Sequence, residues 1–324
     1  MTKKVLLFGD VGIDDTVALI YAYFNAAIDI VGIVADYGNI SRKNALINIH
    51  YVKSLFPSEE VKKIKVIAGA HIPMTGEDPK YVPEIHGEYG LGPIIPPKTL
   101  HDGISDNFFE VVEIIKKYKE EDLIIVNIGR LTSLASLFIL YESLMNTVKA
   151  YYIMGGAFWI PGNITAVSEA NFYGDPAAAQ VVLANAKNVK IIPLNATNQA
   201  IATPKMVNYI DQVGKVPLIK ILLDYYYDFY KKRNPSIQGS PLHDVLTLMA
   251  VIHPGMLTYQ SHPVYIVQDV AGIARGQSIA DIRPYVDLKS DTQGDSVVGG
   301  EVHEIAFELD YATFYYDFMS VMTK

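Results

Sequence analysis

Short apolar runs that alternate with helix-length segments constrain the fold of this chain more than any other feature of its sequence. In the first part of the chain we predict strands at 5–8, at 30–35 and within 61–67, and helices at 16–24 and from Ser41 to about residue 56. Strands that are joined through a helix lie parallel, with a right-handed crossover between them. The alternation therefore predicts a parallel sheet that is covered by helices.

The same alternation continues toward the middle of the chain and then changes. The pattern is mainly helical from about 204 to 254, and strand-like segments after Pro263 indicate an antiparallel addition at a sheet edge. We therefore predict one α/β domain over 1–324, with a Rossmann-like, mainly parallel sheet flanked by helices, and with extra helices and an antiparallel β addition toward the C-terminus. The further predicted strands are 123–127, 148–154, 189–194, 264–267, 279–286 and 302–307, and the further predicted helices are 108–119, one from Thr132, 176–186, 218–230, 241–252 and 311–322.

Composition limits the partners that this chain can have. Its 324 residues carry a formal net charge of -8, which argues against nucleic acid or an anionic membrane surface as a partner. Without cysteine, the chain has no disulfide, thiol nucleophile or zinc–thiolate site. No apolar run reaches the roughly 18 residues of a membrane span, and acids interrupt the first apolar region, so we expect a soluble, cytoplasmic protein. The 22 tyrosines favour self-association, as a homodimer or homotetramer.

Three acids follow the first predicted strand within six residues: Asp10, Asp14 and Asp15. In an open α/β sheet, ligands bind outside the carboxyl ends of the strands, so a site is expected at this turn. Two like charges about 4 Å apart repel by about 4 kcal/mol at an effective dielectric near 20. A hard divalent cation would relieve that repulsion. The alternative is helix capping by Asp14 or Asp15, which accounts for one acid but not for three.

Other predicted strands also end in polar residues. Asn39 follows the second strand, the turn around Ile128 follows the fourth, and Met154 ends the fifth, before a loop with Asn163, Glu169 and Asn171. Amides and a carboxylate beside the aromatic residues of that loop suit the hydroxyls and ring of a sugar. Ordinary turn chemistry, in which Asn and Ser bond to their own backbone, is the alternative.

Three further groups are candidates for chemistry. His243 and Asp244 lie in an apolar predicted helix, where an unpaired charge is costly. His243 could act as a proton donor and Asp244 as a metal ligand. The alternative is that His243 is a core histidine and Asp244 a helix cap. Tyr226 and Tyr230 fall on one helix face and could form either core or a stacking wall for a ring. His86 lies in the long irregular stretch 69–103, which we interpret as a lid or a surface loop.

These motifs together resemble, in order, those of the inosine-uridine preferring nucleoside hydrolase family. The opening signature of that family is Asp-x-Asp-Pro-Gly-x-Asp-Asp, and Asp10, Gly12, Asp14 and Asp15 match it. The resemblance extends to about residue 254. It includes Gly-Asn at 38–39, His-Gly-Glu-Tyr-Gly-Leu-Gly at 86–92, Ile-Gly-Arg-Leu-Thr-Ser-Leu-Ala at 128–135, Met-Gly-Gly at 154–156, Gly-Asn at 162–163, Glu-Ala-Asn at 169–171, Asp-Pro at 175–176 and Leu-His-Asp at 242–244.

The resemblance implies a calcium-dependent enzyme that hydrolyses ribonucleosides to free base and ribose. In that family pattern a Ca²⁺ ion is bound by Asp10, Asp15, Asp244 and the backbone carbonyl of Ile128, and Asp10 takes the proton from a water. For the sugar, the resemblance implies that its 2′- and 3′-hydroxyls are held by Asp14, Asn39 and Asn171, that its 5′-hydroxyl is held by Asn163 and Glu169, and that Met154 packs under it. For the base, it implies that His243 protonates the departing base and that His86, Tyr226 and Tyr230 close over it.

The chain departs from the family pattern at several positions. Phe8 stands in place of the first Asp of the signature, Arg130 in place of Pro, and Asn195 where the family tends to have Asp. The loss of a carboxylate at Phe8 leaves a rival function open, a nucleoside- or ribose-binding protein with reduced or lost turnover. A phosphoryl-transfer enzyme with Asp10 as nucleophile is disfavoured, because Gly12 and Asp14 stand where its motif needs Asp and Thr.

Overall fold

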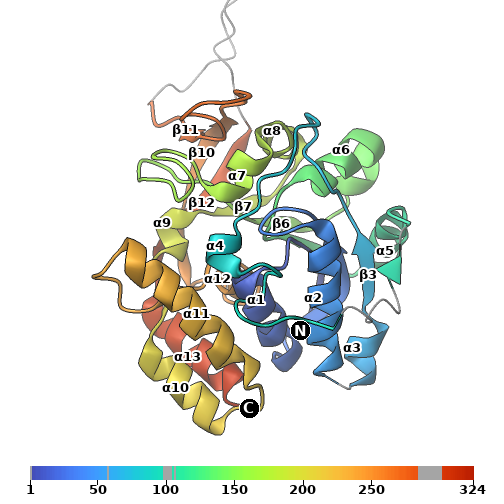
Figure 1. Ribbon diagram of the computed structural model, residues 1–324. Coiled ribbons are helices and arrows are strands. Elements are labelled where there is room, and N and C mark those ends of the chain that lie inside the picture. The colour runs from blue at the N-terminus through green and yellow to red at the C-terminus, as the bar shows by residue number, and fades with distance from the viewer. Residues whose placement is uncertain (1, 57, 98–103, 106, 284–300) are drawn as a thin grey trace, which may run out of the picture.

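A mostly parallel sheet lies at the centre of the molecule, with helices on both faces (Figure 1). The computed structural model describes residues 2–56, 58–97, 104–105, 107–283 and 301–324. Within these residues the sheet has ten strands in the order β11-β10-β12-β7-β6-β5-β1-β2-β3-β4. The strands are β1 (Lys3–Gly9), β2 (Ile28–Ala35), β3 (Lys65–Ala68), β4 (Ile104–Ser105), β5 (Ile124–Asn127), β6 (Ala150–Met154), β7 (Val189–Ile192), β10 (Leu257–Ile266), β11 (Ser278–Ala280) and β12 (Val302–Leu309).

The strand directions confirm the predicted fold class. All pairs from β4 through β1 to β7 and β12 are parallel, whereas β10 runs antiparallel to both β12 and β11 at the other end of the sheet. A separate antiparallel pair, β8 (Ile201–Ala202) with β9 (Ser240–Pro241), lies outside this sheet. The C-terminal antiparallel strands thus extend one edge of a parallel core.

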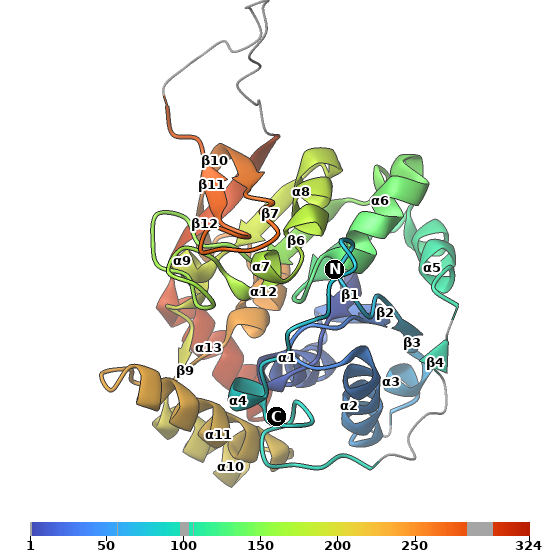
Figure 2. The ribbon, with the colours of Figure 1, turned by 45° about the horizontal axis from the view of Figure 1, so that its top comes forward.

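Helices cover both faces because the side chains of each strand alternate between two apolar clusters. On β1, Val5 and Leu7 belong to the cluster that includes α1 and α12, whereas Leu6 and Phe8 belong to the cluster that includes α5, α6 and α8. Figures 1 and 2 show α10, α11 and α13 together at one side of the molecule. The helices are α1 (Ile13–Phe24), α2 (Arg42–Ser54), α3 (Glu59–Lys63), α4 (Pro83–His86), α5 (Glu110–Tyr118), α6 (Thr132–Met145), α7 (Ala170–Gly174), α8 (Pro176–Asn185), α9 (Leu194–Thr197), α10 (Pro204–Val213), α11 (Leu218–Arg233), α12 (His243–Ile252) and α13 (Tyr311–Met322).

Several predicted boundaries are wrong, for local reasons. The third strand lies at the end of the predicted range 61–67, because residues 61–63 belong to a short helix, α3, that was not predicted. Ser58 caps the first turn of α3 by accepting a hydrogen bond from the Val61 N–H, and β3 begins at Lys65. The predicted strand at 264–267 is the end of a longer strand, β10, which begins at Leu257 and pairs with β12. Alternation along β10 is weak because many of its side chains are partly exposed.

Other predicted segments are shorter than expected or lie partly outside the described residues. The predicted strand at 279–286 contains only the last two residues of β11, and its positions 284–286 lie outside the described residues. The irregular stretch 69–103 includes the single-turn helix α4, and its positions 98–103 also lie outside them. The predicted helix at 241–252 begins at His243, because Pro241 pairs in β9.

The register of the central strands brings their carboxyl ends to one level. Phe8 of β1 is paired with Asn127 of β5, which is paired in turn with Ile153 of β6. The residues that follow these strands therefore gather at one edge, where helix α12 also packs against α1. No helix among the described residues is both long enough and apolar enough to cross a membrane.

Candidate functional site

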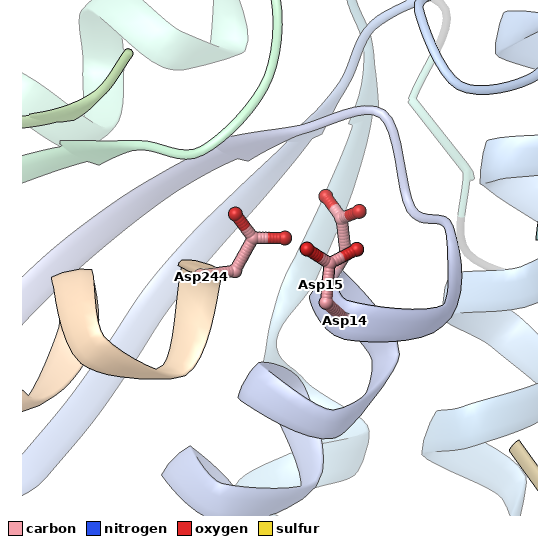
Figure 3. A group of neighbouring side chains, drawn as sticks. All are labelled: Asp14, Asp15 and Asp244. Carbon is pink, nitrogen blue, oxygen red and sulfur yellow. The ribbon is translucent and has the colours of Figure 1, made fainter. Parts of the chain in front are cut away.

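Buried acids gather at the carboxyl ends of the central strands. Asp14 and Asp15 lie in the first turn of α1, and Asp244 lies in the first turn of α12. Figure 3 shows the carboxylate of Asp244 facing those of Asp14 and Asp15, and each residue offers an oxygen that lies within 4.8 Å of the others. All three are at most 5% exposed. Both helices thus direct their N-terminal ends, which favour negative charge, at the same point.

The carboxylates of this group fit a divalent cation. Asp14 Oδ1 and Asp15 Oδ1 are buried and have no hydrogen-bond partner. Burial raises the pKa of Asp14 to about 7, and burial together with the neighbouring acids raises the pKa of Asp15 and of Asp244 well above the ordinary value. Buried charges are normally paired or coordinate a metal, and carboxylate oxygens are the ligands of hard cations.

Asp10 lies beside this group and is held by a different set of contacts. Its Oδ2 accepts a hydrogen bond from the Asn39 backbone N–H (2.7 Å), and its Oδ1 accepts one from Asn39 Nδ2 (3.1 Å). Asn39 Nδ2 also lies 3.2 Å from Asp15 Oδ2, so one amide bridges the two acids. Gly38 makes room for this arrangement, because a Cβ there would lie 1.7 Å from Asp10 Oδ2.

Among the four predicted metal ligands, the structure brings Asp15 and Asp244 into one group and places Asp10 next to it. Asp14, which was predicted to bind sugar hydroxyls, completes the group of three. The carbonyl oxygen of Ile128 accepts a hydrogen bond from Asn171 Nδ2 at 3.2 Å and borders the same pocket. Binding of a cation by Asp10, Asp15, Asp244 and the Ile128 carbonyl therefore stays a prediction.

A pocket beside the acids contains nearly all the residues predicted to bind substrate. It is lined by residues from α1, α4, α7, α11 and α12 and from the loops after β2, β5 and β6. The predicted residues that line it are Asp14, Asn39, His86, Ile128, Met154, Asn163, Glu169, Asn171, Tyr226, Tyr230, His243 and Asp244.

The loop before α7 shows both the turn chemistry and the pocket placement that the sequence left open. Glu169 caps α7, because its carboxylate accepts hydrogen bonds from the backbone N–H groups of Asn171 (2.8 Å) and Phe172 (3.2 Å), and it accepts another from Gly156 (3.0 Å). Asn163 Oδ1 accepts a hydrogen bond from the Ala170 N–H at 2.9 Å. These contacts fix the loop while its polar side chains border the pocket.

A chain of hydrogen bonds joins His243 to Asp14 across the pocket. His243 Nε2 lies 3.2 Å from the Tyr230 hydroxyl, which lies 3.3 Å from the Tyr226 hydroxyl, and Tyr226 donates to Asp14 Oδ2 at 3.2 Å. On the other side of the ring, His243 Nδ1 lies 2.7 Å from Thr197 Oγ1. Burial lowers the pKa of His243 to about 4. The ring is therefore neutral near pH 7 and has a hydroxyl partner at each nitrogen.

His86 comes from α4 and contacts the start of α1. Its Nδ1 accepts a hydrogen bond from the Ile13 N–H at 3.0 Å, so in the neutral ring the proton is on Nε2. Burial lowers the pKa of His86 to about 3. His86 Nδ1 lies 3.9 Å from Asp14 Oδ1, and the ring centroids of His86 and Tyr226 are 5.7 Å apart. The stretch that was predicted to be a lid or a surface loop thus places a neutral ring against the pocket.

The positions that depart from the family pattern have distinct surroundings. Phe8 is fully buried in the apolar cluster of α5, α6 and α8. Asn195 holds the loop after β6, because its amide accepts from the Phe158 N–H (3.0 Å) and donates to the Phe158 carbonyl (2.8 Å). Arg130 is buried beside the acids and lines a neighbouring cavity, and its Nη1 lies 2.5 Å from Asn171 Oδ1 and 3.5 Å from Asp10 Oδ2.

Sequence reasoning missed two polar residues near the site. Thr197 lies in α9, just after β7, and the rule that sites form after strand ends could have indicated it. Asp36 follows β2, is fully buried, and accepts hydrogen bonds from the Ala70 N–H (2.6 Å) and from the Ser133 hydroxyl. Burial raises the pKa of Asp36 to about 8. The position of Asp36 directly after a strand could have indicated this residue in the same way.

Comparison with known proteins identifies close relatives in sequence and structure. The model of the family described as "Inosine-uridine preferring nucleoside hydrolase" matches residues 5–315. The inosine-uridine preferring nucleoside hydrolase of Leishmania major is 31% identical over 87% of this chain and 89% of its own length, and uridine nucleosidase 1 of Arabidopsis thaliana is 29% identical over 86% and 82%. The solved structure of a purine-preferring ribonucleoside hydrolase from Gardnerella vaginalis superposes with a TM-score of 0.85, at 26% identity over 99% of this chain and 98% of that one.

Proposed function

This chain belongs to the inosine-uridine preferring nucleoside hydrolase family and hydrolyses the N-glycosidic bond of ribonucleosides, and we propose that it does so in the acidic pocket, with Asp10 as general base. Water adds its hydroxyl to the anomeric carbon, the bond to the base nitrogen breaks, and the water's other proton is taken up by Asp10. The base leaves with a proton from the protein, so the products are free base and ribose. The observation that supports this location is the group of buried, partly unpartnered acids beside Asp10.

The names of the relatives set the range of substrates to test. They include a uridine nucleosidase, an inosine-uridine preferring hydrolase and a purine-preferring hydrolase. We therefore propose purine or pyrimidine ribonucleosides as the substrate class. The residues that line the pocket on the side of Tyr226 and Tyr230 are the ones that would contact the base and set the preference.

A divalent cation, for which we propose calcium, would be held by Asp15 and Asp244 with Asp10 or Asp14 and the Ile128 carbonyl. When bound, such an ion lowers the pKa of water and orients the sugar hydroxyls. Carboxylate and carbonyl oxygens suit calcium, and the chain has no cysteine that would favour a softer metal.

The protein's own residues supply the remaining requirements. Cleavage of the bond passes through an oxocarbenium-like state, as in glycoside hydrolysis, and the nearby acids stabilise positive charge on the ribose. Asn39 holds Asp10 through two hydrogen bonds and so fixes the direction of its carboxylate. Both nitrogens of His243 have hydroxyl partners, so a proton that the ring gives to the departing base can be replaced through Tyr230 or Thr197.

A reducing-sugar assay tests this proposal directly. Purified protein is incubated with inosine and with uridine, in EDTA and after Ca²⁺ is restored. We expect release of ribose that EDTA abolishes and Ca²⁺ restores. Nucleoside binding in calorimetry without release of ribose would instead support the rival function of a binding protein, and ribose release that EDTA leaves unchanged would refute the role of the cation.

A further inference from the structure

Arg130 is a buried cation among the acids of the site. It stands where the family pattern has proline, and it is 4% exposed. Its Nη1 lies 2.5 Å from Asn171 Oδ1 and 3.5 Å from Asp10 Oδ2. A buried arginine is costly unless its charge is paired, and here Asp10 pairs the charge while Asn171 accepts a hydrogen bond.

The contacts of Asn171 allow only one orientation of its carboxamide. Arginine has only donors, so the atom of Asn171 that faces Arg130 must be the oxygen. The amide nitrogen then faces three acceptors, namely the carbonyl oxygens of Ile128 (3.2 Å) and Met154 (3.1 Å) and the sulfur of Met154 (3.2 Å). Asn171 also lines the pocket. Arg130 and these acceptors therefore fix the orientation of the amide from opposite ends.

Gly174 shows that space in α7 is reserved for the arginine side chain. A Cβ at Gly174 would lie 2.1 Å from Arg130 Nε, 2.4 Å from its Cδ and 3.1 Å from its Cζ. These atoms belong to a flexible side chain, so an alanine at this position can be accommodated if Arg130 moves. Gly174 does not line the pocket of the acids, and it therefore offers a way to displace Arg130 without touching the sugar site.

We propose that Arg130 is a positioning residue of the sugar site, which holds the Asn171 carboxamide in the orientation that recognises one ribose hydroxyl. This inference rests on the proposed function for its link to ribose, but the contact itself does not. Without the guanidinium, the Asn171 oxygen loses its donor, and only the contacts of the amide nitrogen still hold the carboxamide, so its position is less well fixed. Discrimination between ribose and the deoxyribose that lacks this hydroxyl would then be lost.

The kinetic test compares Arg130→Met and Gly174→Ala with the wild type. We expect kcat/KM for inosine and uridine to fall by about 10–100-fold in both variants, as is typical when a group that orients a ligand is removed. Binding of 2′-deoxyinosine and 3′-deoxyinosine is measured as competitive inhibition. For the analogue that lacks the hydroxyl contacted by Asn171, we expect the inhibition constant to stay nearly the same in both variants as in the wild type. Equal losses for inosine and both analogues would overturn the inference.

A matched control separates positioning from structural damage. Arg275 is also buried and donates to the Tyr173 carbonyl of α7 at 2.9 Å, but its hydrogen bonds go to Tyr173, Val270, Glu77 and Gly174 and not to Asn171. Arg275→Met should lower the melting temperature without changing the ratio between inosine and the deoxy analogues. A change in that ratio equal to the one in Arg130→Met would overturn the specific role of Arg130.

A measurement without substrate keeps this inference distinct from the proposed function. In protein labelled with ¹⁵N-asparagine, the side-chain amide signal of Asn171 is assigned by its absence in Asn171→Asp. We expect its protons to exchange with water faster in Arg130→Met and in Gly174→Ala than in the wild type. Unchanged exchange would show that Arg130 does not hold Asn171, whereas a wild type that releases no ribose refutes only the proposed function.

Discussion

The buried acids predict an unusual dependence of stability on pH when divalent cations are removed. Burial raises the pKa of Asp14 to about 7 and that of Asp36 to about 8, from an ordinary value of 3.8. A carboxyl whose pKa is higher in the folded state binds protons more tightly there, so its contribution to stability is lost as pH rises through the folded pKa. The EDTA-treated protein should therefore become less stable between pH 6.5 and pH 8.

The size of the effect follows from these two pKa values. Integration of the difference in bound protons between pH 6.5 and 8 gives a loss of about 1 kcal/mol for Asp14 and about 2 kcal/mol for Asp36. Asp10, Asp15 and Asp244 also have raised pKa values and act in the same direction. The losses from Asp14 and Asp36 should together lower the melting temperature by about 4 °C for a chain of this size.

The histidines do not disturb this pH window. Burial lowers the pKa of His86 to about 3 and of His243 to about 4, from an ordinary 6.5. Their contribution to stability is lost only as pH falls below 6.5, where the unfolded chain begins to bind protons that the folded rings do not. Above pH 6.5 both rings are mainly neutral in either state.

Thermal melts in EDTA and in Ca²⁺, at pH 6.5 and pH 8, test the prediction. Ca²⁺ should raise the melting temperature more at pH 8 than at pH 6.5, because a cation stabilises the ionised acids of the pocket. Asp36→Asn should remove about 2 kcal/mol of the pH dependence of stability. Asp14→Asn should remove the smaller contribution of Asp14, and only in EDTA. A metal-free protein whose melting temperature is constant or rises between pH 6.5 and 8 would refute the reasoning.

Three further predictions concern catalysis. Asp10→Asn should lower kcat by about 10²–10⁴-fold without unfolding the protein, because the general base is lost; a near-normal rate together with an unchanged melting curve would contradict that role. His243→Ala should slow inosine cleavage strongly but leave p-nitrophenyl riboside, whose leaving group needs no proton, nearly unaffected, and Thr197→Val should show the same contrast more weakly; equal slowing of both substrates would exclude leaving-group protonation. Tyr226→Phe removes a hydrogen bond to the carboxylate of Asp14 and should raise KM by about tenfold or more, and an unchanged KM would show that this hydroxyl does not order the pocket.

The local pattern of the sequence determined the architecture and the composition of the site. Apolar runs with β-branched residues predict buried parallel strands wherever they occur, and polar residues that follow such strands must meet at one edge. That reasoning predicted that Asp14, Asn39 and Asn171 would lie close together, and all three line one pocket although they are far apart in sequence. The stretch before β3 shows its limit, because the short helix α3, which Ser58 caps, was not predicted.

Only the tertiary structure decided how the polar side chains pair. Arg130 and Asn171 are 41 residues apart, and Thr197 and His243 are 46 residues apart, so no periodicity indicates that their polar atoms meet. Which acid joins Asp15 and Asp244 also depends on the directions of side chains from α1 and α12. Hydrogen bonds require positions accurate to a few tenths of an ångström, whereas hydrophobic burial depends mainly on which face a residue occupies. The sequence therefore determined which groups are present in the pocket, and the packing of its elements determined their partners.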